Sequence, residues 1–355
     1  MSGERADRLA ALAAETGLDA LLVTGMVNLR WLTGFTGTSG LAVVGDGLRA
    51  FVTDFRYVEQ AADQAADFAQ HRCERELADA LPAVLGARAR IGFDDAHLSV
   101  KGHRDLAERL SGAELVPAGG LVERLRAVKD PGEIEAIRAA AALADAAFEA
   151  TVSAGLVGRS ERAVALALED EMRRRGAQRP SFDSIVAAGA HGALPHAVPR
   201  DEPIPAGSLV VIDWGAELDG YCSDCTRTVA AGEPDAEAAE VYGIVLAAQE
   251  AALAAVRPGA GGRAVDAVAR DRISAAGHGE RFGHGLGHGV GLEVHEAPRL
   301  SKASEATLEA GNVVTVEPGV YLPGRLGVRI EDLVAVTDDG HDVLSSLPKA
   351  LRTVG

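Results

Sequence analysis

The stretch from Val210 to Thr228 constrains this chain more than any other, because it predicts a buried β-hairpin. It reads VVIDWGAELDGYCSDCTRT. Two runs of strand-forming residues flank Asp219 and Gly220, a dipeptide that readily adopts the positive φ angles of a two-residue turn. If Leu218 and Tyr221 close this turn, the register of the two strands is fixed.

That register brings two acidic side chains together. It places Asp213 opposite Thr226 and Gly215 opposite Asp224, so the two aspartates are diagonal neighbours on one face, roughly 7 Å apart at the backbone. Like charges this close repel, and between apolar strands they are costly without a partner. Two solvated aspartates on an exposed hairpin are the alternative. The apolar run at 210–212 favours a strand covered on both faces, and hence a buried pair that holds a divalent cation.

Length and charge restrict the function classes. At 355 residues the chain is long enough for two domains. Its 35 Lys and Arg against 52 Asp and Glu give a formal net charge of −17, which argues against general electrostatic binding of nucleic acid or an anionic membrane. We find no apolar stretch near 18 residues and no signal-like start, and we therefore expect a soluble, cytoplasmic protein.

The three cysteines do not predict a disulfide framework, because they are few and odd in number. Cys222 and Cys225 form a C-x-x-C motif that is typical of redox or zinc sites. On a strand, however, residues three apart point to opposite faces, which disfavours both sites.

Apolar patterning predicts a small α/β domain over residues 1–122, where strands and helices alternate. Within it we expect helices at 4–17 and 57–70, a hairpin at 41–54 and a strand at 89–94. The glycines at 119 and 120 and the charged residues up to Pro131 are expected to form a connector.

The second domain, residues 129–355, is expected to be α+β, with helices packed on an antiparallel sheet. Pro131 suits the first turn of a helix, and Ser160 is a favourable N-cap for the next one. The predicted helices span 131–152, 161–175, 236–256 and 262–276.

A glycine-rich stretch adds three histidines to the candidate site. Residues 282–296 read FGHGLGHGVGLEVHE and carry His284, His288 and His295. The glycines resemble a phosphate-binding loop, but no strand, spacing or later acidic residue supports a dinucleotide site. Glycines here more plausibly let backbone and imidazoles approach a ligand closely.

A second predicted hairpin contributes two more carboxylates. The strands at 313–321 and 328–336 are expected to pair and carry Glu317 and Glu331. These two alone would also fit a solvated cross-strand pair. Two hairpins with two carboxylates each suggest a duplicated half-unit.

Four carboxylates and one histidine form a set of mostly hard donors that suits manganese, cobalt or zinc better than copper or an iron–sulfur cluster. Four anionic ligands carry more charge than one divalent ion needs. Two ions about 3.5 to 4 Å apart, bridged by shared carboxylates, fit the set better.

Taken together, these motifs resemble the pita-bread metallopeptidases, specifically the Xaa-Pro peptidases (prolidase and aminopeptidase P), over nearly the whole chain. The matching stretches are VVIDWGA, YCSDCTRT, GHGLGH, VEPG and VRIED, and NLRWLTGFTGTSG and TDFRY resemble the N-terminal domain of these enzymes. The resemblance implies an α+β pita-bread catalytic domain with a smaller α/β creatinase-like N-terminal domain. It also implies two divalent ions, manganese before cobalt or zinc, with these ligands: Asp213 on one ion, His288 and Glu317 on the other, and Asp224 and Glu331 bridging them.

The resemblance also assigns supporting roles to His196, His284, His295 and Arg329. Glu317 is expected to accept and relay a proton, and His196 and His295 to hydrogen-bond the substrate carbonyl and the developing oxyanion. Arg329 is expected to orient Glu331 or to relay a proton, with a structural ion pair as the alternative.

The implied activity is hydrolysis of the Xaa-Pro bond at the N-terminus of proline-containing peptides by a homodimer. The sequence leaves open whether the enzyme is a dipeptidase or an aminopeptidase. The N-terminal domain argues against a methionine aminopeptidase, and the complete ligand set argues against creatinase. Another hydrolase on the same fold and a non-catalytic binding module remain as alternatives.

Overall fold

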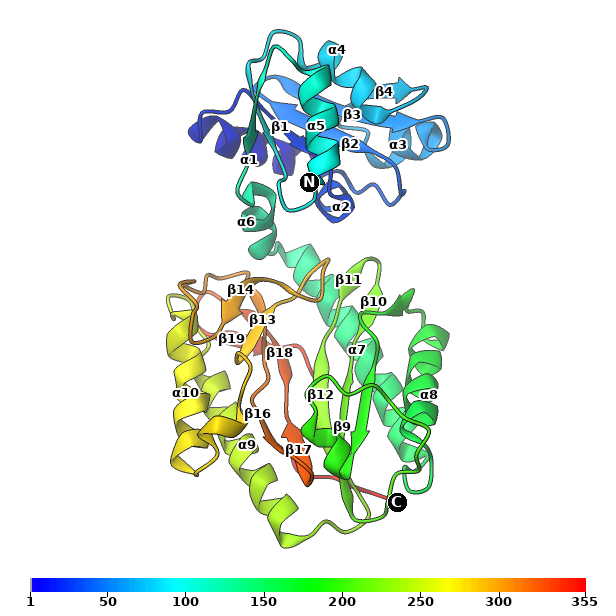
Figure 1. The fold of residues 1–355 in the computed structure, drawn as a ribbon, viewed down its shortest axis with the longest axis vertical. Helices are drawn as coiled ribbons and strands as arrows, with labels where there is room; N and C mark the ends of the chain where they lie inside the picture. Colours follow the sequence, from blue (N-terminus) through cyan, green and yellow to red (C-terminus); the bar gives the residue numbers. More distant parts are fainter. Residues whose placement is uncertain (1) are drawn as a thin grey trace. The chain divides into compact units, whose positions relative to one another are not determined.

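The computed structural model describes residues 2–355, and the chain divides into two compact units between Arg126 and Ala127 (Figure 1). The predicted connector is wrong in its local structure, since it contains the helix α6 (Leu121–Ala127). In that helix Leu121, Val122 and Arg126 are buried, and Arg126 donates a 2.8 Å hydrogen bond to Asn28. Tertiary contacts thus make a helix of a stretch that reads as charged and irregular.

The first unit is built on one mixed six-stranded sheet in the order β4-β3-β2-β1-β5-β6. Both α/β character and the hairpin around residue 46 are present as predicted. The strands are β1 (Ala20–Val23), β2 (Leu41–Gly45), β3 (Leu48–Asp54), β4 (Ala69–Cys73), β5 (Arg90–Phe93) and β6 (Glu114–Pro117). The helices before α6 are α1 (Ser2–Glu15), α2 (Met26–Thr33), α3 (Val58–Gln64), η1 (Leu77–Ala80), α4 (Leu81–Leu85) and α5 (Val100–Arg109).

The predicted helix at 57–70 is too long. Helix α3 ends at Gln64, Phe68 is buried at the turn that follows, and β4 then pairs in parallel with β3. The alanine-rich composition favours a helix locally. The open edge of β3 overrides this preference, because pairing satisfies its free backbone groups.

The second unit contains helices packed on mainly antiparallel sheets, which agrees with the predicted α+β organisation. Its helices are α7 (Pro131–Ser153), α8 (Glu161–Arg174), η2 (Gly189–Ala193), α9 (Ala236–Ala255), α10 (Gly262–Ala275) and η3 (Gly279–Arg281). Its strands in the first half are β7 (Arg179–Pro180), β8 (Ile185–Ala188), β9 (Ser208–Trp214), β10 (Ala216–Leu218), β11 (Tyr221–Cys222) and β12 (Cys225–Ala231). Those of the second half are β13 (Gly287–Gly289), β14 (Glu296–Leu300), β15 (Val313–Val316), β16 (Gly319–Leu322), β17 (Leu326–Arg329), β18 (Asp332–Val336), β19 (His341–Val343) and β20 (Thr353–Val354).

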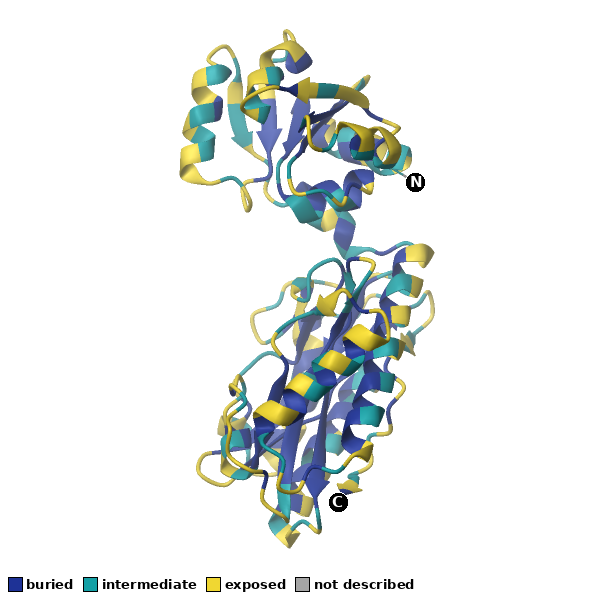
Figure 2. Ribbon diagram, turned by 90° about the vertical axis from the view of Figure 1, so that its right-hand side faces the viewer, coloured by how far each residue is buried: buried dark blue, intermediate teal, exposed yellow. Residues whose placement is uncertain are grey.

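Each half of this unit has a helix pair and a long hairpin with its own apolar core. Helices α7 and α8 pack against β8, β9 and β12, where Phe148 and Trp214 stack with ring centroids 4.3 Å apart. Helices α9 and α10 pack against β15 to β18 around Phe282 and Val314. Figure 1 shows α9 and α10 at the left of this unit and α8 at its right, and Figure 2 shows exposed outer helix faces around almost wholly buried strands.

Helix α9 corrects the expectation that the chain has no apolar stretch near 18 residues. Helix α9 is 20 residues long, and the mean hydropathy of its most apolar window is 1.3, so it meets the length and composition of a membrane span. In the structure it packs on α10 and buries residues such as Val241, Val245 and Ala248 in the core. The helix therefore has one face covered by the core, and its other face is exposed.

Candidate metal centre

The first hairpin forms in the predicted register. Leu218 pairs with Tyr221, and the turn residues Asp219 and Gly220 have φ angles of 49° and 81°. Asp213 lies opposite Thr226, as expected. The ladder is interrupted beyond the pair of Trp214 with Cys225 and resumes at Glu217 with Cys222 in the same register.

The second hairpin is also interrupted, at the two predicted glutamates. Val316 pairs with Asp332 on one side of the break, and Gly319 pairs with Arg329 on the other. The prediction that Glu317 and Glu331 lie within paired strands is therefore wrong. They occupy the break, although the common register on both sides places them opposite each other. Pro318 follows Glu317 and has no N–H to donate to a ladder, which is the local reason for the break.

The backbone N–H groups of the two glutamates in the second break find partners in other segments of the unit. The N–H of Glu331 donates to the carbonyl of Thr226, and the N–H of Glu317 donates to that of Leu286. Each acidic residue is thereby held by a neighbouring segment, so its side chain is positioned without belonging to a regular strand.

All five predicted ligands come together. Asp213, Asp224 and Glu331 each offer one oxygen, and these three atoms lie within 4.8 Å of one another. Nε2 of His288, on β13, lies 3.6 Å from Asp224 Oδ2 and 3.3 Å from Glu317 Oε1. Hairpins from both halves and the glycine-rich stretch thus supply one cluster.

The buried polar atoms of this cluster fit a divalent cation. Within residues 2–355, Asp213 Oδ1 and Glu331 Oε1 are buried and have no hydrogen-bond partner. A buried carboxylate oxygen left in this way is costly unless a cation neutralises it. Nδ1 of His288 lies 3.1 Å from the Gly289 carbonyl, an arrangement that leaves Nε2 as the ligand atom.

Electrostatics in the cluster support the same conclusion. Burial, followed by the neighbouring carboxylates, raises the pKa of Asp224 and of Glu331 well above the ordinary range. Burial also acts to raise the pKa of Glu317, but the hydrogen bond and charge of His288, followed by the charges of His284 and Arg329, lower it to about 2. The cluster can release all its protons at neutral pH only when cations replace them.

Arg329 connects the cluster to its surroundings. Its guanidinium donates to Asp213 Oδ2 at 2.6 Å, to the Tyr321 hydroxyl at 2.9 Å and to Thr226 Oγ1 at 3.0 Å. Thr226 Oγ1 in turn donates to Glu331 Oε2 at 2.7 Å. The direct ion pair is therefore with Asp213, and Arg329 reaches Glu331 only through Thr226.

His284 lies beside this network and outside the ligand contacts. Its Nε2 is 2.9 Å from the Tyr321 hydroxyl, and its Nδ1 is 2.8 Å from the Gly285 carbonyl. Sequence reasoning did not identify Tyr321, because a single tyrosine on a strand usually belongs to the core.

Cys222 of the C-x-x-C motif is a buried free thiol whose pKa burial raises to about 12, so it is not a ready metal ligand.

A cavity of about 580 Å³ opens onto the cluster. The five ligands line it together with His196, His284, His295 and Arg329. The rings of His295 and His288 lie with centroids 4.3 Å apart, and burial, followed by the charge of His288, lowers the pKa of His295 to about 4. His196 is exposed on the cavity wall.

Part of the cavity wall could not be identified from the sequence. It includes an apolar group and a cation, namely Phe182, Ile185, Pro195, Ala197, Val198, Pro199 and Arg299. These residues have no motif of their own, and only the fold brings them to the metal cluster. Apart from Arg299, they add an apolar lining to a cavity whose metal cluster is charged.

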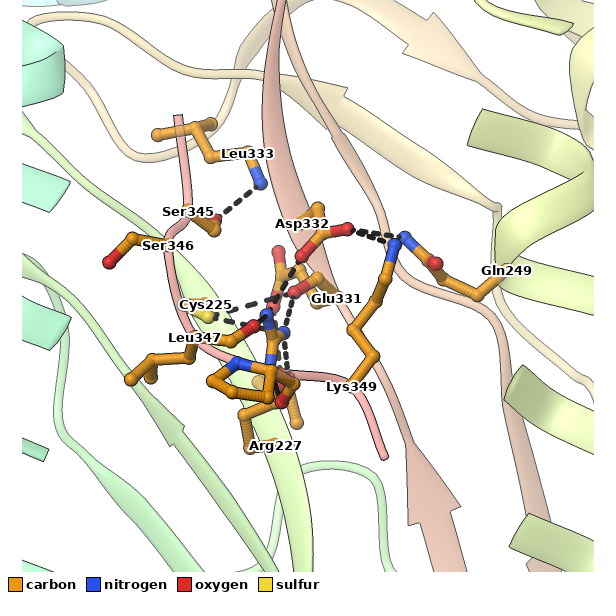
Figure 3. A network of polar contacts seen from close by, with 12 residues as sticks. Cys225, Arg227, Gln249, Glu331, Asp332, Leu333, Ser345, Ser346, Leu347 and Lys349 are labelled. Atoms are coloured by element: carbon orange, nitrogen blue, oxygen red, sulfur yellow. Dashed lines mark hydrogen bonds and ion pairs between the residues drawn. The ribbon is translucent and has the colours of Figure 1, made fainter. Parts of the chain in front are cut away.

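A second polar network holds Glu331 from its backbone (Figure 3). Arg227 donates to the carbonyl of Glu331 and, at 2.9 Å, to Asp332 Oδ1. Asp332 also accepts from Lys349 at 2.7 Å and from Gln249 at 3.0 Å. The network fastens the ligand-bearing break to helix α9 and to the C-terminal segment.

Comparison with known families finds two matches. The model for Metallopeptidase family M24 matches residues 135–338, and that for the Creatinase/Prolidase N-terminal domain matches residues 5–128. The first of these contains every predicted metal ligand.

Individual proteins match over the whole length. The structure is similar to that of an Xaa-Pro dipeptidase from Bacillus anthracis, with a TM-score of 0.97 and 42% identity over 100% of both chains. It is also similar to an X-Pro aminopeptidase from Thermotoga maritima MSB8, with a TM-score of 0.92 and 36% identity over 99% of this chain and 100% of the other. An Xaa-Pro dipeptidase of Pyrococcus furiosus is 35% identical over 98% of this chain and 99% of the relative.

Proposed function

Since the chain belongs to metallopeptidase family M24, whose centres are dinuclear, we propose that it hydrolyses the Xaa-Pro bond at the N-terminus of proline-containing peptides. The observation that carries this proposal is the complete five-residue ligand set at the base of a cavity with an apolar wall. The names of the similar proteins, which are Xaa-Pro dipeptidases and an X-Pro aminopeptidase, support it.

The ligands named above would hold two divalent ions, which we propose to be manganese, with cobalt or zinc as alternatives. When bound, the ions supply Lewis-acid polarisation of the scissile carbonyl and lower the pKa of a water molecule. The residues of the chain provide the binding geometry, the proton transfers and the exclusion of other substrates.

Glu317 is the proposed proton carrier. Thr315 Oγ1 donates to it at 3.1 Å, which orients the carboxylate. In this orientation it accepts a proton from the attacking water and returns it to the proline nitrogen as that nitrogen leaves. The leaving nitrogen must be protonated because it becomes a secondary amine.

His295 and His196 are the proposed donors to the substrate carbonyl. The low pKa of His295 makes it a neutral imidazole at pH 7, so it donates one hydrogen bond and does not compete with the ions as a cation. A donor of this kind, placed where negative charge develops, typically contributes about 3 kcal/mol to transition-state stabilisation.

Arg299 favours a dipeptide as the substrate. It is exposed on the cavity wall, and its guanidinium makes no hydrogen bond or ion pair with the residues that the structure describes. In an Xaa-Pro dipeptide the carboxylate follows directly after the scissile bond, so a nearby guanidinium can pair with it. A longer peptide replaces this carboxylate by an amide.

The test is parallel hydrolysis of an Xaa-Pro dipeptide and an Xaa-Pro-Yaa tripeptide by chelator-stripped enzyme, with and without manganese. We expect manganese-dependent cleavage of the dipeptide, weaker cleavage of the tripeptide, and none of the matching Xaa-Ala peptide. Failure to cleave either proline peptide with metal demonstrably bound would contradict the proposal and favour another hydrolase or a binding module.

The Arg299→Gln variant tests the dipeptide preference. We expect KM for the dipeptide to rise about tenfold, since a charge-assisted hydrogen bond of this kind contributes roughly 1.5 kcal/mol. KM for the tripeptide should change little. An equal rise for both substrates would show that Arg299 does not read the carboxylate.

We also propose that the enzyme is a cytoplasmic homodimer. Its acidic composition suits a soluble protein, and the dimer follows from the resemblance to Xaa-Pro peptidases. Light scattering of the purified protein and fractionation of the source cells test these two points. A monomer in solution, or recovery with the membrane fraction, would contradict them.

A further inference from the structure

We propose that Glu161 is a positioning residue for substrate binding, because it fastens both ends of the segment that forms the cavity wall around His196. This inference rests on the proposed peptidase function. Glu161 itself lies on α8 and does not line the cavity.

The side chain of Glu161 is only 2% exposed, and all its hydrogen-bond donors come from one excursion of the chain. The N–H of Ala188 donates to Oε1 at 2.8 Å, where the chain leaves β8. The N–H of Arg200 donates to Oε2 at 3.0 Å, where the chain returns. Between them, Nδ1 of His191 donates to Oε2 at 2.8 Å.

The residues between these anchors form the wall. Residues 195–199 all line the cavity, and they include His196. Leu194 and Val198 are 57% and 75% exposed, and the apolar side chains that the segment buries are the small ones of Ala193 and Ala197. Apolar burial therefore holds the segment weakly, and the polar contacts at its ends help to fix its position.

Two further contacts complete the support. Arg329 donates to the carbonyl of Pro195 at 3.2 Å, which ties the segment to the metal cluster. Gly192 lies in backbone contact with Gly327, where an added Cβ would come within 1.8 Å of the Gly192 carbonyl oxygen. These contacts fix the middle of the segment. Glu161 supports its two ends, together with the pairing of Ala188 with Val210 and the hydrogen bond from the N–H of Arg162 to the carbonyl of Arg200.

Helix α8 makes Glu161 a rigid anchor. Ser160 caps the helix by accepting from the N–H of Ala163 at 3.1 Å, which places Glu161 in the first turn. A carboxylate is favourable there because the N-terminal end of a helix carries partial positive charge. Glu161 is therefore held by α8 and by the core that α8 packs against. Through Glu161, the cavity wall is joined to the same core.

The Glu161→Gln variant should loosen the wall. A glutamine presents an amide nitrogen in place of one oxygen, so at least one N–H group of Ala188, His191 or Arg200 loses its acceptor. We expect kcat/KM for the Xaa-Pro dipeptide to fall about tenfold, mainly through KM, with metal content unchanged.

Hydrogen–deuterium exchange of the manganese-loaded full chain tests the anchor without any substrate. In Glu161→Gln the peptide covering 189–200 should exchange faster than in the wild type, and the rest of α8 should not change. The matched control is Glu169→Gln on the same helix, where the glutamate is 21% exposed and pairs with Arg173 of α8 itself. Unchanged exchange at 189–200 would overturn the proposal, whatever the kinetics show.

Kinetics separate positioning from simple stability. If Glu161 acts through His196, adding Glu161→Gln to a His196→Ala background should cost little more than His196→Ala alone. Faster exchange with unchanged KM and kcat would also overturn the proposal. Should Glu161→Gln fail to fold, His191→Ala removes one donor and must give the same two effects in weaker form. A wild type that cleaves no proline peptide would refute the proposed function but leave the exchange result valid.

Discussion

Side chains that are not themselves predicted metal ligands hold the carboxylates of the metal cluster in position. Thr226 Oγ1 accepts a hydrogen bond from Arg329 and donates one to Glu331, so one hydroxyl links the cation to that carboxylate. Thr228 lies two residues further along β12, and its hydroxyl contacts only backbone atoms of Arg329. The two threonines therefore allow a matched comparison.

Thr226→Val should lower kcat/KM for the Xaa-Pro dipeptide by about tenfold. The change keeps the shape of the side chain but leaves buried polar atoms of Arg329 and Glu331 without a partner, at a cost of roughly 1–3 kcal/mol. Thr228→Val should have a smaller effect on activity. Steady-state kinetics with metal analysis of both variants check this, and equal losses would show that the hydroxyl link is not specific.

Removal of the metals should make stability fall as pH rises. The pKa values of Asp224 and Glu331 are raised, so without cations the folded chain binds more protons than the unfolded chain. This contribution is fully present below the unfolded pKa of about 4 and is lost as pH rises through the raised folded values.

Thermal denaturation of chelator-stripped and manganese-loaded protein between pH 5 and 8 measures this effect. The Tm of the stripped protein should fall with pH more steeply than that of the loaded protein. Asp224→Asn, which has no proton to lose at that position, should flatten the slope of the stripped protein. Equal slopes with and without manganese would contradict the assignment.

At the scale of elements, the sequence predicted the register of the first hairpin because the Asp219-Gly220 turn fixes it. It did not predict the breaks at the ligands, because the flanking valines favour continuous strands and the break forms through contacts with segments distant in sequence. Pro318 was the one local signal of a break. The helix predicted at 57–70 failed for the same kind of reason, since pairing at a sheet edge outweighed local propensity.

The network around Arg227 shows how an element is fixed. The side chains of Arg227 and Asp332 are 3% and 2% exposed. They join β12, β18 and the C-terminal segment. Removal of one partner leaves a buried charge without compensation.

Arg227→Met should therefore lower the free energy of unfolding by about 3 kcal/mol, as measured by urea denaturation of the metal-loaded protein. Lys349, whose side chain is 21% exposed, provides the control. Lys349→Met should cost less than about 1 kcal/mol, because partial exposure weakens the ion pair. Similar losses in the two variants would contradict a dominant role for Arg227.

At the scale of the whole molecule, the predicted α+β pita-bread catalytic domain with a creatinase-like N-terminal domain is confirmed by the family matches and the similar solved structures. The sequence motifs were sufficient to indicate this family, because each predicted ligand lies in a short stretch with its own pattern. The other wall residues, at 182–185, 195 and 197–199, and Arg299 could not be predicted in this way, because they approach the ligands only in the folded chain.

The division of the ligands between two hairpins also determines when the site can exist. Asp213 and Asp224 belong to the first half, whereas His288, Glu317 and Glu331 belong to the second. The C-terminal segment then fastens the last of these ligands through Arg227 and Asp332. During synthesis the first pair of aspartates leaves the ribosome before its partners, so the complete set of five residues can form only after Glu331 has been made.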